Sequence, residues 1–217
     1  MKTDSALIVT QETLPAAVEA LGRIDRDFAR ALQEVGLPPL RYRAPGFATL
    51  LRIIIAQQVS LASAQAIADR LNAACKPVTP ETFLALSDDD LRQIGLSRPK
   101  QRYARALAKT LIEGALDLDR LVMLDDEAAI ESLTRAKGIG RWTAEVYLLF
   151  SLGRPDVFPA NDIGLMIGAQ LLKGLEVRPD RIALEEQARA WRPYRSVAAR
   201  MLWHYRRQAG AIPDDWE

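Results

Sequence analysis

The chain has 217 residues and a mass of 24.1 kDa, which suffices for one domain with a substantial core or for two small packed lobes. No apolar run approaches the roughly 18 residues of a membrane-spanning helix, and the first residues include Asp4 and lack the apolar stretch of a secretory signal. Cys75 is the single cysteine and His204 the single histidine, which excludes disulfide frameworks and four-cysteine metal clusters within one chain and disfavours Ser-His-Asp triads. We expect an intracellular protein, cytoplasmic (nucleoid) if bacterial, whose chemistry uses carboxylates, backbone dipoles or aromatic surfaces.

The net charge of +1 hides an uneven distribution of charged residues. Seven acids lie between Glu113 and Glu131, where only Arg120 opposes them. No acid lies between residues 187 and 213, whereas this stretch holds six arginines: Arg189, Arg192, Arg195, Arg200, Arg206 and Arg207. A second basic cluster comprises Arg98, Lys100, Arg102, Arg105 and Lys109. The asymmetry indicates a face that meets a polyanion, although arginine stems that cover apolar helix surface would give the same pattern.

Taken in chain order, the sequence predicts helices almost throughout, because apolar residues recur at helical spacing and strand alternation is nearly absent. The first 40 residues are the least clear part, and residues 6–10 could form a short strand or a helix. A helix from 47 to 56 is followed by one that opens at Ser60. The remaining expected helices cover residues 79–86, 87–95, 97–114, 125–133, 141–150, 162–172, 180–190 and 193–208.

Capping residues mark several of these boundaries. Thr79 is followed by a proline, which suits an N-cap with proline at the first helical position. Ser87 and Asp90 have the spacing of a capping box, and Ser97 and Gly114 flank a longer helix. The sequence therefore predicts an all-α fold of about ten short helices in two lobes around a cleft.

A hairpin between two of the expected helices carries the most specific local pattern. Gly138, Ile139 and Gly140 form the turn, and two glycines let the backbone turn tightly and approach another molecule closely. The helix that follows presents unpaired N–H groups and the positive end of its dipole, which suits a phosphate. Lys137 and Arg141 flank the turn with positive charge. A simple helix–helix connector is the alternative interpretation.

This hairpin resembles the helix-hairpin-helix of the DNA base-excision glycosylase superfamily. The family pattern continues into a Gly/Pro-rich loop that ends in an aspartate, as residues 153–162 (GRPDVFPAND) do here. Residues 51–60 (LRIIIAQQVS) and 191–203 (WRPYRSVAARMLW) are similar to the alkyladenine branch, the 3-methyladenine DNA glycosylase II type. The resemblance covers about residues 47–208 and implies the compact form without the N-terminal β-domain of larger members.

The resemblance implies one glycosylase domain over residues 1–217. Residues 45–150 would form the helical lobe that ends in the helix-hairpin-helix. Residues 1–44 and 151–217 would form the second lobe.

The family's catalytic aspartate falls on Asp162 by this resemblance. Its place at the start of an expected helix favours the ionised carboxylate, and a fixed negative charge stabilises the oxocarbenium-like transition state of N-glycosidic cleavage. An ordinary helix cap is the structural alternative. Asn161 could supply that cap instead and leave Asp162 for catalysis.

A base alkylated at a ring nitrogen is already cationic and leaves without a general acid, which fits the scarcity of histidine. The pocket for such a base needs aromatic faces. We expect Trp142 to supply one, with Tyr147 and Trp191 as further candidates, although large aromatics are often core residues. Relatives often carry tyrosine where this chain has Ile163, which implies a less aromatic pocket and a different substrate range.

Flipping the base out of the duplex leaves a gap that the protein must fill. The family loop that enters the minor groove corresponds to residues 57–61, and Gln58 is the first wedge candidate, Leu61 the second. Arg195 and Ser196 resemble a family Pro-x-Arg-Ser motif that borders the site and braces the helix of Asp162. Arg195 itself could reach DNA phosphate or serve as a structural partner.

The resemblance thus implies a set of DNA-binding residues and a cation site. The DNA-binding set is Gln58, Lys137, Gly138, Ile139, Gly140, Arg141, Thr143 and Arg195. The carbonyl groups of Thr134, Ala136 and Ile139 would hold a structural Na⁺ or K⁺. We expect no other cofactor and no iron–sulfur cluster.

These observations predict a monofunctional DNA glycosylase that flips out alkylated bases and hydrolyses their N-glycosidic bond to start base-excision repair. The expected partner is double-stranded DNA with alkylated bases, the expected state is a monomer, and no membrane is involved. One alternative is a glycosylase/lyase of the endonuclease III or 8-oxoguanine type, but such enzymes carry a lysine at the position of Trp142. The other is a non-catalytic helix-hairpin-helix module, which the loop ending at Asp162 disfavours.

Overall fold

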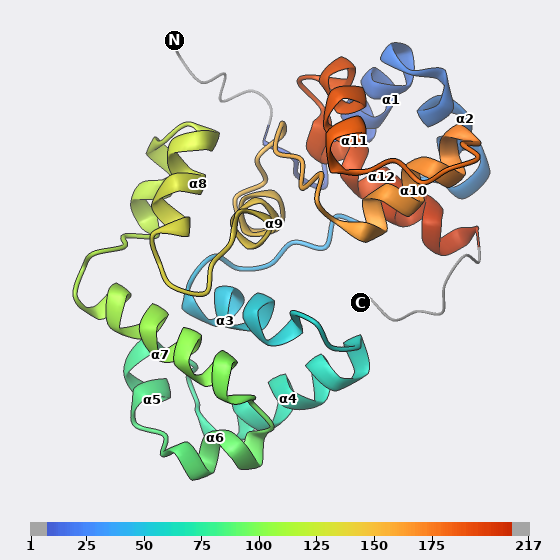
Figure 1. Cartoon of the computed structure of the whole chain (residues 1–217). Helices are drawn as coiled ribbons and strands as arrows, with labels where there is room; N and C mark the ends of the chain where they lie inside the picture. Colours follow the sequence, from blue (N-terminus) through green and yellow to red (C-terminus); the bar gives the residue numbers. More distant parts are fainter. Residues whose placement is uncertain (1–7, 210–217) are drawn as a thin grey trace. The chain divides into compact units, whose positions relative to one another are not determined.

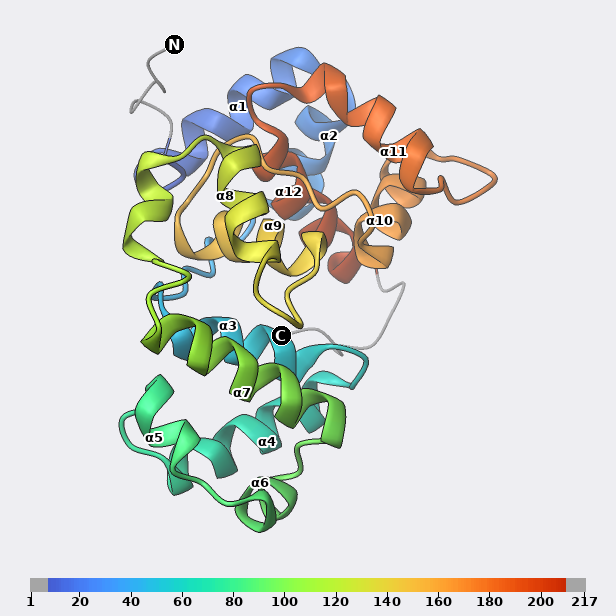
Figure 2. The same cartoon turned by 60° about the vertical axis from the view of Figure 1, so that its left-hand side comes forward.

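The structure, a computed structural model, describes residues 8–209 except for the side chain of Leu61. These residues form twelve α-helices and short 3-10 helices without a strand, so the all-α prediction is confirmed (Figures 1 and 2). Residues 8–10, part of the uncertain strand or helix, lie outside regular elements, and residues 6 and 7 lie outside the described residues. No helix in the described part has the length and apolar character to cross a bilayer.

The described residues form two compact units, and the division between them falls within α9 (Arg141–Ser151). The first unit holds residues 8–42 and 148–209, and the second holds residues 43–147. The helices of the first unit are α1 (Leu14–Ile24), α2 (Arg26–Val35), α10 (Ile163–Lys173), α11 (Arg181–Ala188) and α12 (Arg195–Gln208), with η3 (Arg189–Trp191). Two segments far apart in the sequence therefore fold together.

The core of the first unit is centred on the indole of Trp191. Its ring meets Phe28 edge-on at 5.1 Å and Phe158 at 5.6 Å between ring centroids. Its N–H donates to Asp25 at 2.8 Å, and Lys173 pairs with the same carboxylate. Because the buried polar atoms are matched, this aromatic centre joins α2, α10 and η3 without leaving an unpaired donor.

Helices α10 and α12 approach each other closely at Gly168. A Cβ atom there would lie 2.5 Å from the carbonyl oxygen of Leu202, a distance that no side chain tolerates. The glycine therefore lets the two backbones pack in direct contact. This packing fixes the start of α10 relative to the middle of α12, where the candidate catalytic groups lie.

The second unit is built around α3 (Phe47–Ala56), which is apolar on nearly every side and deeply buried. Such a helix needs cover all round. The other elements of this unit are α4 (Leu61–Ala74), α5 (Pro80–Leu84), α6 (Asp88–Ile94), α7 (Arg98–Ile112), η2 (Asp119–Met123), α8 (Asp126–Thr134) and the first part of α9.

The capping predictions in this unit are largely correct. Thr79 caps α5 in a capping box with Thr82, and Ser87 caps α6 in a box with Asp90. Ser97 precedes α7 as expected, but its side chain makes no capping hydrogen bond. The helix also ends at Ile112, two residues before the expected Gly114. The sequence pattern thus predicted the position of this helix correctly and its ends less precisely.

Candidate active site and DNA interface

The loop before Asp162 is held on α12 by two side chains. Ser196 is fully buried; its hydroxyl donates to the carbonyl of Val157 at 2.7 Å and accepts the N–H of Val157 at 3.0 Å. Arg195 pairs with Asp156 through two hydrogen bonds of 2.9 and 2.8 Å. The structure thus favours the structural role of Arg195 over phosphate binding, because the carboxylate occupies its guanidinium.

Asp162 itself is the N-cap of α10. Its Oδ1 accepts the N–H of Leu165 at 2.9 Å, so the alternative in which Asn161 caps this helix is wrong. Asp162 adopts the extended backbone of a cap, after a turn in which its N–H donates to the carbonyl of Pro159 at 2.9 Å. The carboxylate is therefore fixed at the positive end of the helix dipole, where a negative charge is stabilised.

Trp203 is a site residue that the sequence reasoning did not assign. Its indole N–H donates to Oδ1 of Asp162 at 3.0 Å, and its ring stacks on Phe150 at 5.5 Å between centroids. The guanidinium of Arg200 lies over the Phe150 ring, 4.7 Å from its centroid. Burial lowers the pKa of Arg200 to about 10. The sequence held one clue to this role of Trp203. It lies seven residues, or two helical turns, after Ser196 and therefore on the same face of α12.

Two of the three aromatic pocket candidates are core residues in the structure. Trp191 is 1% exposed and hydrogen-bonded to Asp25, so its assignment to the base pocket is corrected to a core role. Tyr147 is fully buried, and its hydroxyl accepts the N–H of Gly46 at 2.9 Å. Neither ring presents a face to a base. Trp142, by contrast, is half-buried near the start of α9, and its place in the base pocket stays a prediction.

The hairpin between α8 and α9 has the predicted position and a tight backbone. Ile139 is buried, and its N–H donates to the carbonyl of Ala136 at 3.1 Å, while Lys137 is exposed. Gly138 has φ +96°, and a Cβ there would lie 2.4 Å from the Cβ of Tyr103 on α7. Gly140 instead faces open space, with nothing within 4 Å of a Cβ. The first glycine thus serves the fold, and only the second leaves the surface open to an approaching group.

Two residues of the expected DNA-binding set have structural partners. Arg141 donates to Glu127 at 2.6 and 2.9 Å and to Glu145 at 2.9 Å, and these carboxylates raise its pKa. Thr143 is 2% exposed, and its hydroxyl accepts the side-chain amide of Gln57 at 3.0 Å. The buried Thr143 thus holds the loop after α3, and its assignment to DNA binding is corrected. Arg141 ties α9 to α8, but its side chain is exposed, so its contact with DNA stays a prediction.

The loop between α3 and α4 presents Gln58 to solvent. Gln58 is exposed and has φ +58°, a conformation that costs a non-glycine residue free energy. The loop is fixed on either side of it, because Gln57 is bonded to Thr143 and Ser60 caps α4 by accepting the N–H of Ser63. A strained, exposed residue on a fixed loop fits the wedge prediction, which stays a prediction. Leu61, the second candidate, lies outside the described side chains.

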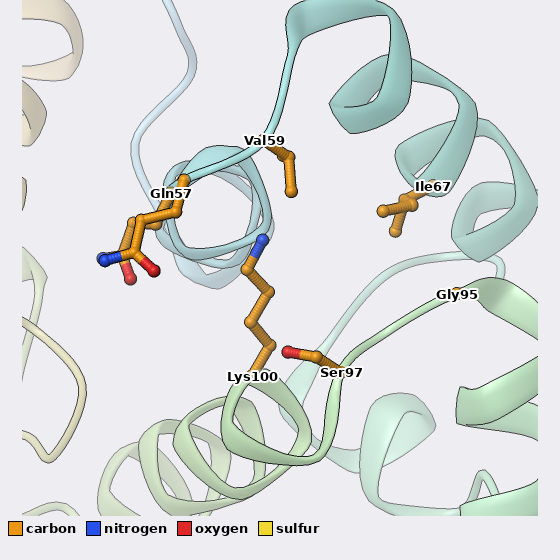
Figure 3. Close-up of a pocket in the computed structure, with 7 residues that line it drawn as sticks. Gln57, Val59, Ile67, Gly95, Ser97 and Lys100 are labelled. Carbon is orange, nitrogen blue, oxygen red and sulfur yellow. The ribbon is translucent and has the colours of Figure 1, made fainter.

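A pocket of about 250 Å³ lies behind this loop. Figure 3 shows Lys100 extending from α7 toward the end of α3, where its ammonium group donates to the carbonyl of Ile55 at 2.6 Å. Burial lowers the pKa of Lys100. The other lining residues are Gln57, Gln58, Val59, Ile67, Gly95 and Ser97. Lys100 therefore caps the carbonyl end of α3 rather than adding a free charge to the surface.

The basic clusters are less available to a polyanion than the sequence suggests. In the tail, Arg189 pairs with Glu186, Arg195 with Asp156, and the buried Arg200 donates to the carbonyls of Leu40 and Leu149. On α7, Arg105 donates to the carbonyl of Leu86 and to Asp88, while Arg98, Arg102 and Lys109 are exposed. Arg195 and Arg200 thus serve the fold, whereas Arg98, Arg102 and Lys109 leave exposed positive charge, and a face that meets a polyanion stays a prediction.

Comparisons with known proteins agree with these features. Residues 51–193 match the family described as HhH-GPD superfamily base excision DNA repair protein. DNA-3-methyladenine glycosylase 1 of Schizosaccharomyces pombe is 31% identical over 190 residues, 84% of this chain and 83% of that protein. A Bacillus subtilis relative is 33% identical over 163 residues, which span 71% of this chain and 56% of that protein.

The structural comparison extends over nearly the whole chain. The Schizosaccharomyces pombe 3-methyladenine DNA glycosylase, solved in complex with abasic DNA, superposes with a TM-score of 0.81 at 28% identity and covers 93% of this chain and 99% of that one. The helical fold of the described residues, the glycine hairpin and the aspartate that caps α10 after a Pro-rich loop agree with a helix-hairpin-helix base-excision protein. The chain belongs to the HhH-GPD superfamily of base excision DNA repair proteins.

Proposed function

We propose that this protein is a monofunctional DNA glycosylase that releases alkylated bases from double-stranded DNA. It flips the damaged nucleotide out of the duplex and hydrolyses its N-glycosidic bond, which leaves an abasic site. The observation that carries the proposal is the carboxylate of Asp162, held at the start of α10 by the N–H groups of Leu165 and Trp203.

The chemistry follows from the fixed charge at Asp162. The bond between the sugar C1′ and the base nitrogen breaks with its electron pair leaving on the base, so a cationic alkylated ring departs neutral. Positive charge then gathers on the sugar, and a preorganised carboxylate stabilises it without reorganisation. Water then forms the new bond to C1′ and releases one proton to the solvent, which leaves the hydroxyl group of the abasic site. Asp162 stabilises the positive charge of the transition state. The departure of the base needs no proton donor, because the alkylated ring is already positively charged.

The second unit supplies DNA binding in this proposal. Gly140 leaves open space at the start of α9, and the N–H groups in the first turn of a helix can bind a phosphate. Lys137 adds charge from the exposed side of the hairpin. Gln58 enters the duplex as the wedge, and Trp142 provides an aromatic face for the flipped base. A single chain suffices for these contacts, so we propose that the protein acts as a monomer.

A monovalent cation at the hairpin remains part of the proposal. The carbonyl groups of Thr134, Ala136 and Ile139 would hold Na⁺ or K⁺, and the ion would add positive charge toward the DNA backbone. Ala136 already accepts one hydrogen bond from the N–H of Ile139. A carbonyl oxygen has two lone pairs, so this bond is compatible with a second ligand. Removal of all monovalent cations except a bulky ammonium should then weaken DNA binding.

A base-release assay tests the function. DNA methylated with a simple alkylating agent is incubated with the protein, and the free bases are separated by chromatography. We expect release of 3-methyladenine or 7-methylguanine and intact strands until alkali is added. Binding without release would support the non-catalytic module instead.

Borohydride trapping tests the lyase alternative. Strand cleavage by a lyase needs an amine that forms a Schiff base at the sugar, and the position of the lyase lysine holds Trp142 here. We expect no covalent protein–DNA adduct after reduction. An adduct that disappears in Lys137→Gln would overturn the monofunctional assignment.

A further inference from the structure

Arg206 lies beside the candidate catalytic carboxylate, and the sequence reasoning gave it no role in the site. The residue projects from α12 toward the first turn of α10, where it meets the surface of Gly164. An ideal Cβ on Gly164 would lie 2.7 Å from Nη1 of Arg206, 2.8 Å from Oδ1 of Asp162 and 3.2 Å from Cδ1 of Trp203. The guanidinium, the carboxylate and the indole therefore converge on one glycine.

The absence of a side chain at Gly164 is what permits this arrangement. Gly164 is buried and helical, so its backbone does not require glycine, and its φ gives no reason for one. An alanine methyl group would overlap both the guanidinium and the carboxylate. The glycine thus keeps Arg206 close to Asp162 rather than serving a turn.

The charge on Arg206 is poorly solvated and electrostatically coupled to Asp162. Its Nε is buried and has no hydrogen-bond partner within the described part of the chain. Burial lowers the pKa of Arg206, and the charge of Asp162 acts in the opposite direction. An arginine nevertheless stays protonated at neutral pH. A positive charge in a partly desolvated place acts over a longer range than one in water.

We propose that Arg206 is a specificity-determining residue that reduces the preference of the site for cationic damaged bases and favours the release of neutral ones. This inference rests on the proposed glycosylase function. The carboxylate of Asp162 alone would give the site a net charge of −1, and Arg206 offsets it. A cationic 7-methylguanine gains less from a site that is electrostatically balanced than from one that is negative.

The same charge helps a neutral base to leave. When a neutral base such as hypoxanthine departs, the electron pair of the glycosidic bond gives the leaving ring negative charge. A nearby guanidinium stabilises that developing charge. A cationic base carries no such negative charge on leaving, so it gains nothing from Arg206. Both effects change the ratio of the two rates in the same direction.

The test compares single-turnover release of 7-methylguanine and of hypoxanthine by the full-length protein from otherwise identical duplexes. Arg206→Met keeps most of the side-chain stem and removes the charge, and Arg206→Lys keeps the charge. Arg207→Met is the matched control, because it removes one positive charge from the adjacent residue of α12. Thermal unfolding of each variant is measured in parallel.

We expect the ratio of 7-methylguanine release to hypoxanthine release to rise about tenfold in Arg206→Met, a change typical of one charge acting at short range in a protein. The ratio should return toward the wild-type value in Arg206→Lys and stay unchanged in Arg207→Met. Equal losses on both substrates, or an unchanged ratio, would overturn the inference and leave Arg206 a packing residue. If the unmodified protein released neither base, the proposed function itself would fail instead.

Discussion

The indole N–H of Trp203 donates to Oδ1 of Asp162 at 3.0 Å, across 41 residues of sequence. The same oxygen accepts the N–H of Leu165 at 2.9 Å, so two donors fix one end of the carboxylate. Both donors come from well-packed helices, α12 and α10. The orientation of the reactive carboxylate is therefore set before any substrate binds, which is how a fixed charge stabilises a transition state most effectively.

Replacement of Asp162 by asparagine separates capping from charge. Asparagine caps helices as well as aspartate does, so the unfolding temperature should change little. Base release should fall by about 10³-fold or more, because the charge that stabilises the sugar cation is lost. Single-turnover release from methylated duplex DNA measures the loss, and affinity for the same DNA should be kept or improved. Near-normal release would show that Asp162 is only a helix cap.

Replacement of Trp203 by phenylalanine removes the donor and keeps an aromatic ring against Phe150. A hydrogen bond to a charged group contributes more than a neutral one, so we expect release to fall about tenfold with only a small change in stability. Trp203→Ala is the comparison, because it also removes the ring and should lower the free energy of unfolding by about 3 kcal/mol. A phenylalanine variant as active as the wild type would mean that the indole N–H does not orient Asp162.

The two hairpin glycines should respond differently to alanine. Gly140→Ala meets no atom of the protein, so folding should survive while the new methyl group blocks close approach of a phosphate. DNA affinity should then fall for every sequence alike and show a smaller salt dependence. Gly138→Ala collides with Tyr103 and strains a positive φ, so it should destabilise the fold by about 2 kcal/mol or more. Binding isotherms and thermal unfolding distinguish the two outcomes, and identical behaviour of the variants would contradict the assignment.

Trp142→Ala should reduce the release of cationic lesions more than that of neutral ones. Cation–π attraction is worth about 1 kcal/mol or more where water is excluded, and Trp142 is the one of the three expected pocket aromatics that is not buried. Release of 7-methylguanine and hypoxanthine is compared as for Arg206, but the ratio should move in the opposite direction. Equal losses on the two substrates would indicate packing.

Gln58→Gly tests the wedge with little risk to the fold. Relief of the αL strain and the greater freedom of glycine in the unfolded chain oppose each other, so stability should change by less than about 1 kcal/mol. Release from duplex DNA should fall, since nothing would fill the gap left by the flipped base, while release from single-stranded DNA should be unchanged. Equal losses on single and double strands would rule out a wedge.

Local patterns predicted much of this fold, and contacts distant in sequence explain what they missed. The capping boxes at Ser87 and Thr79 depend on neighbours three residues away, so the sequence shows both partners. The helix from Arg26 to Val35 is short and highly charged, and its stability comes from buried side chains such as Phe28. Besides the preceding helix α1, it packs on α10 and α12, which lie more than 100 residues later, and no local pattern reveals these two partners.

The errors in the site have the same origin. The tail arginines stand in a stretch without acids, yet Arg195 finds Asp156, 39 residues earlier in the chain. Asn161 and Asp162 are equally good caps by type, so only the loop geometry decides between them. Trp191 and Trp203 both lie in the stretch 191–203 that resembles the alkyladenine branch. Tertiary packing alone makes the first a core residue and the second a hydrogen-bond donor to Asp162.

The hydrogen bond between Gln57 and Thr143 fixes the distance between two loops of the second unit, the one after α3 and the hairpin before α9. It joins the loop that carries Gln58 to the first turn of the helix after the hairpin, at 3.0 Å between side-chain atoms. With the proposed roles of both parts, the point where the duplex is opened and the point where its backbone is held keep a constant separation. The hairpin would therefore bind the DNA backbone at a constant number of nucleotides from the flipped base. This distance would not depend on the DNA sequence, because no base is read.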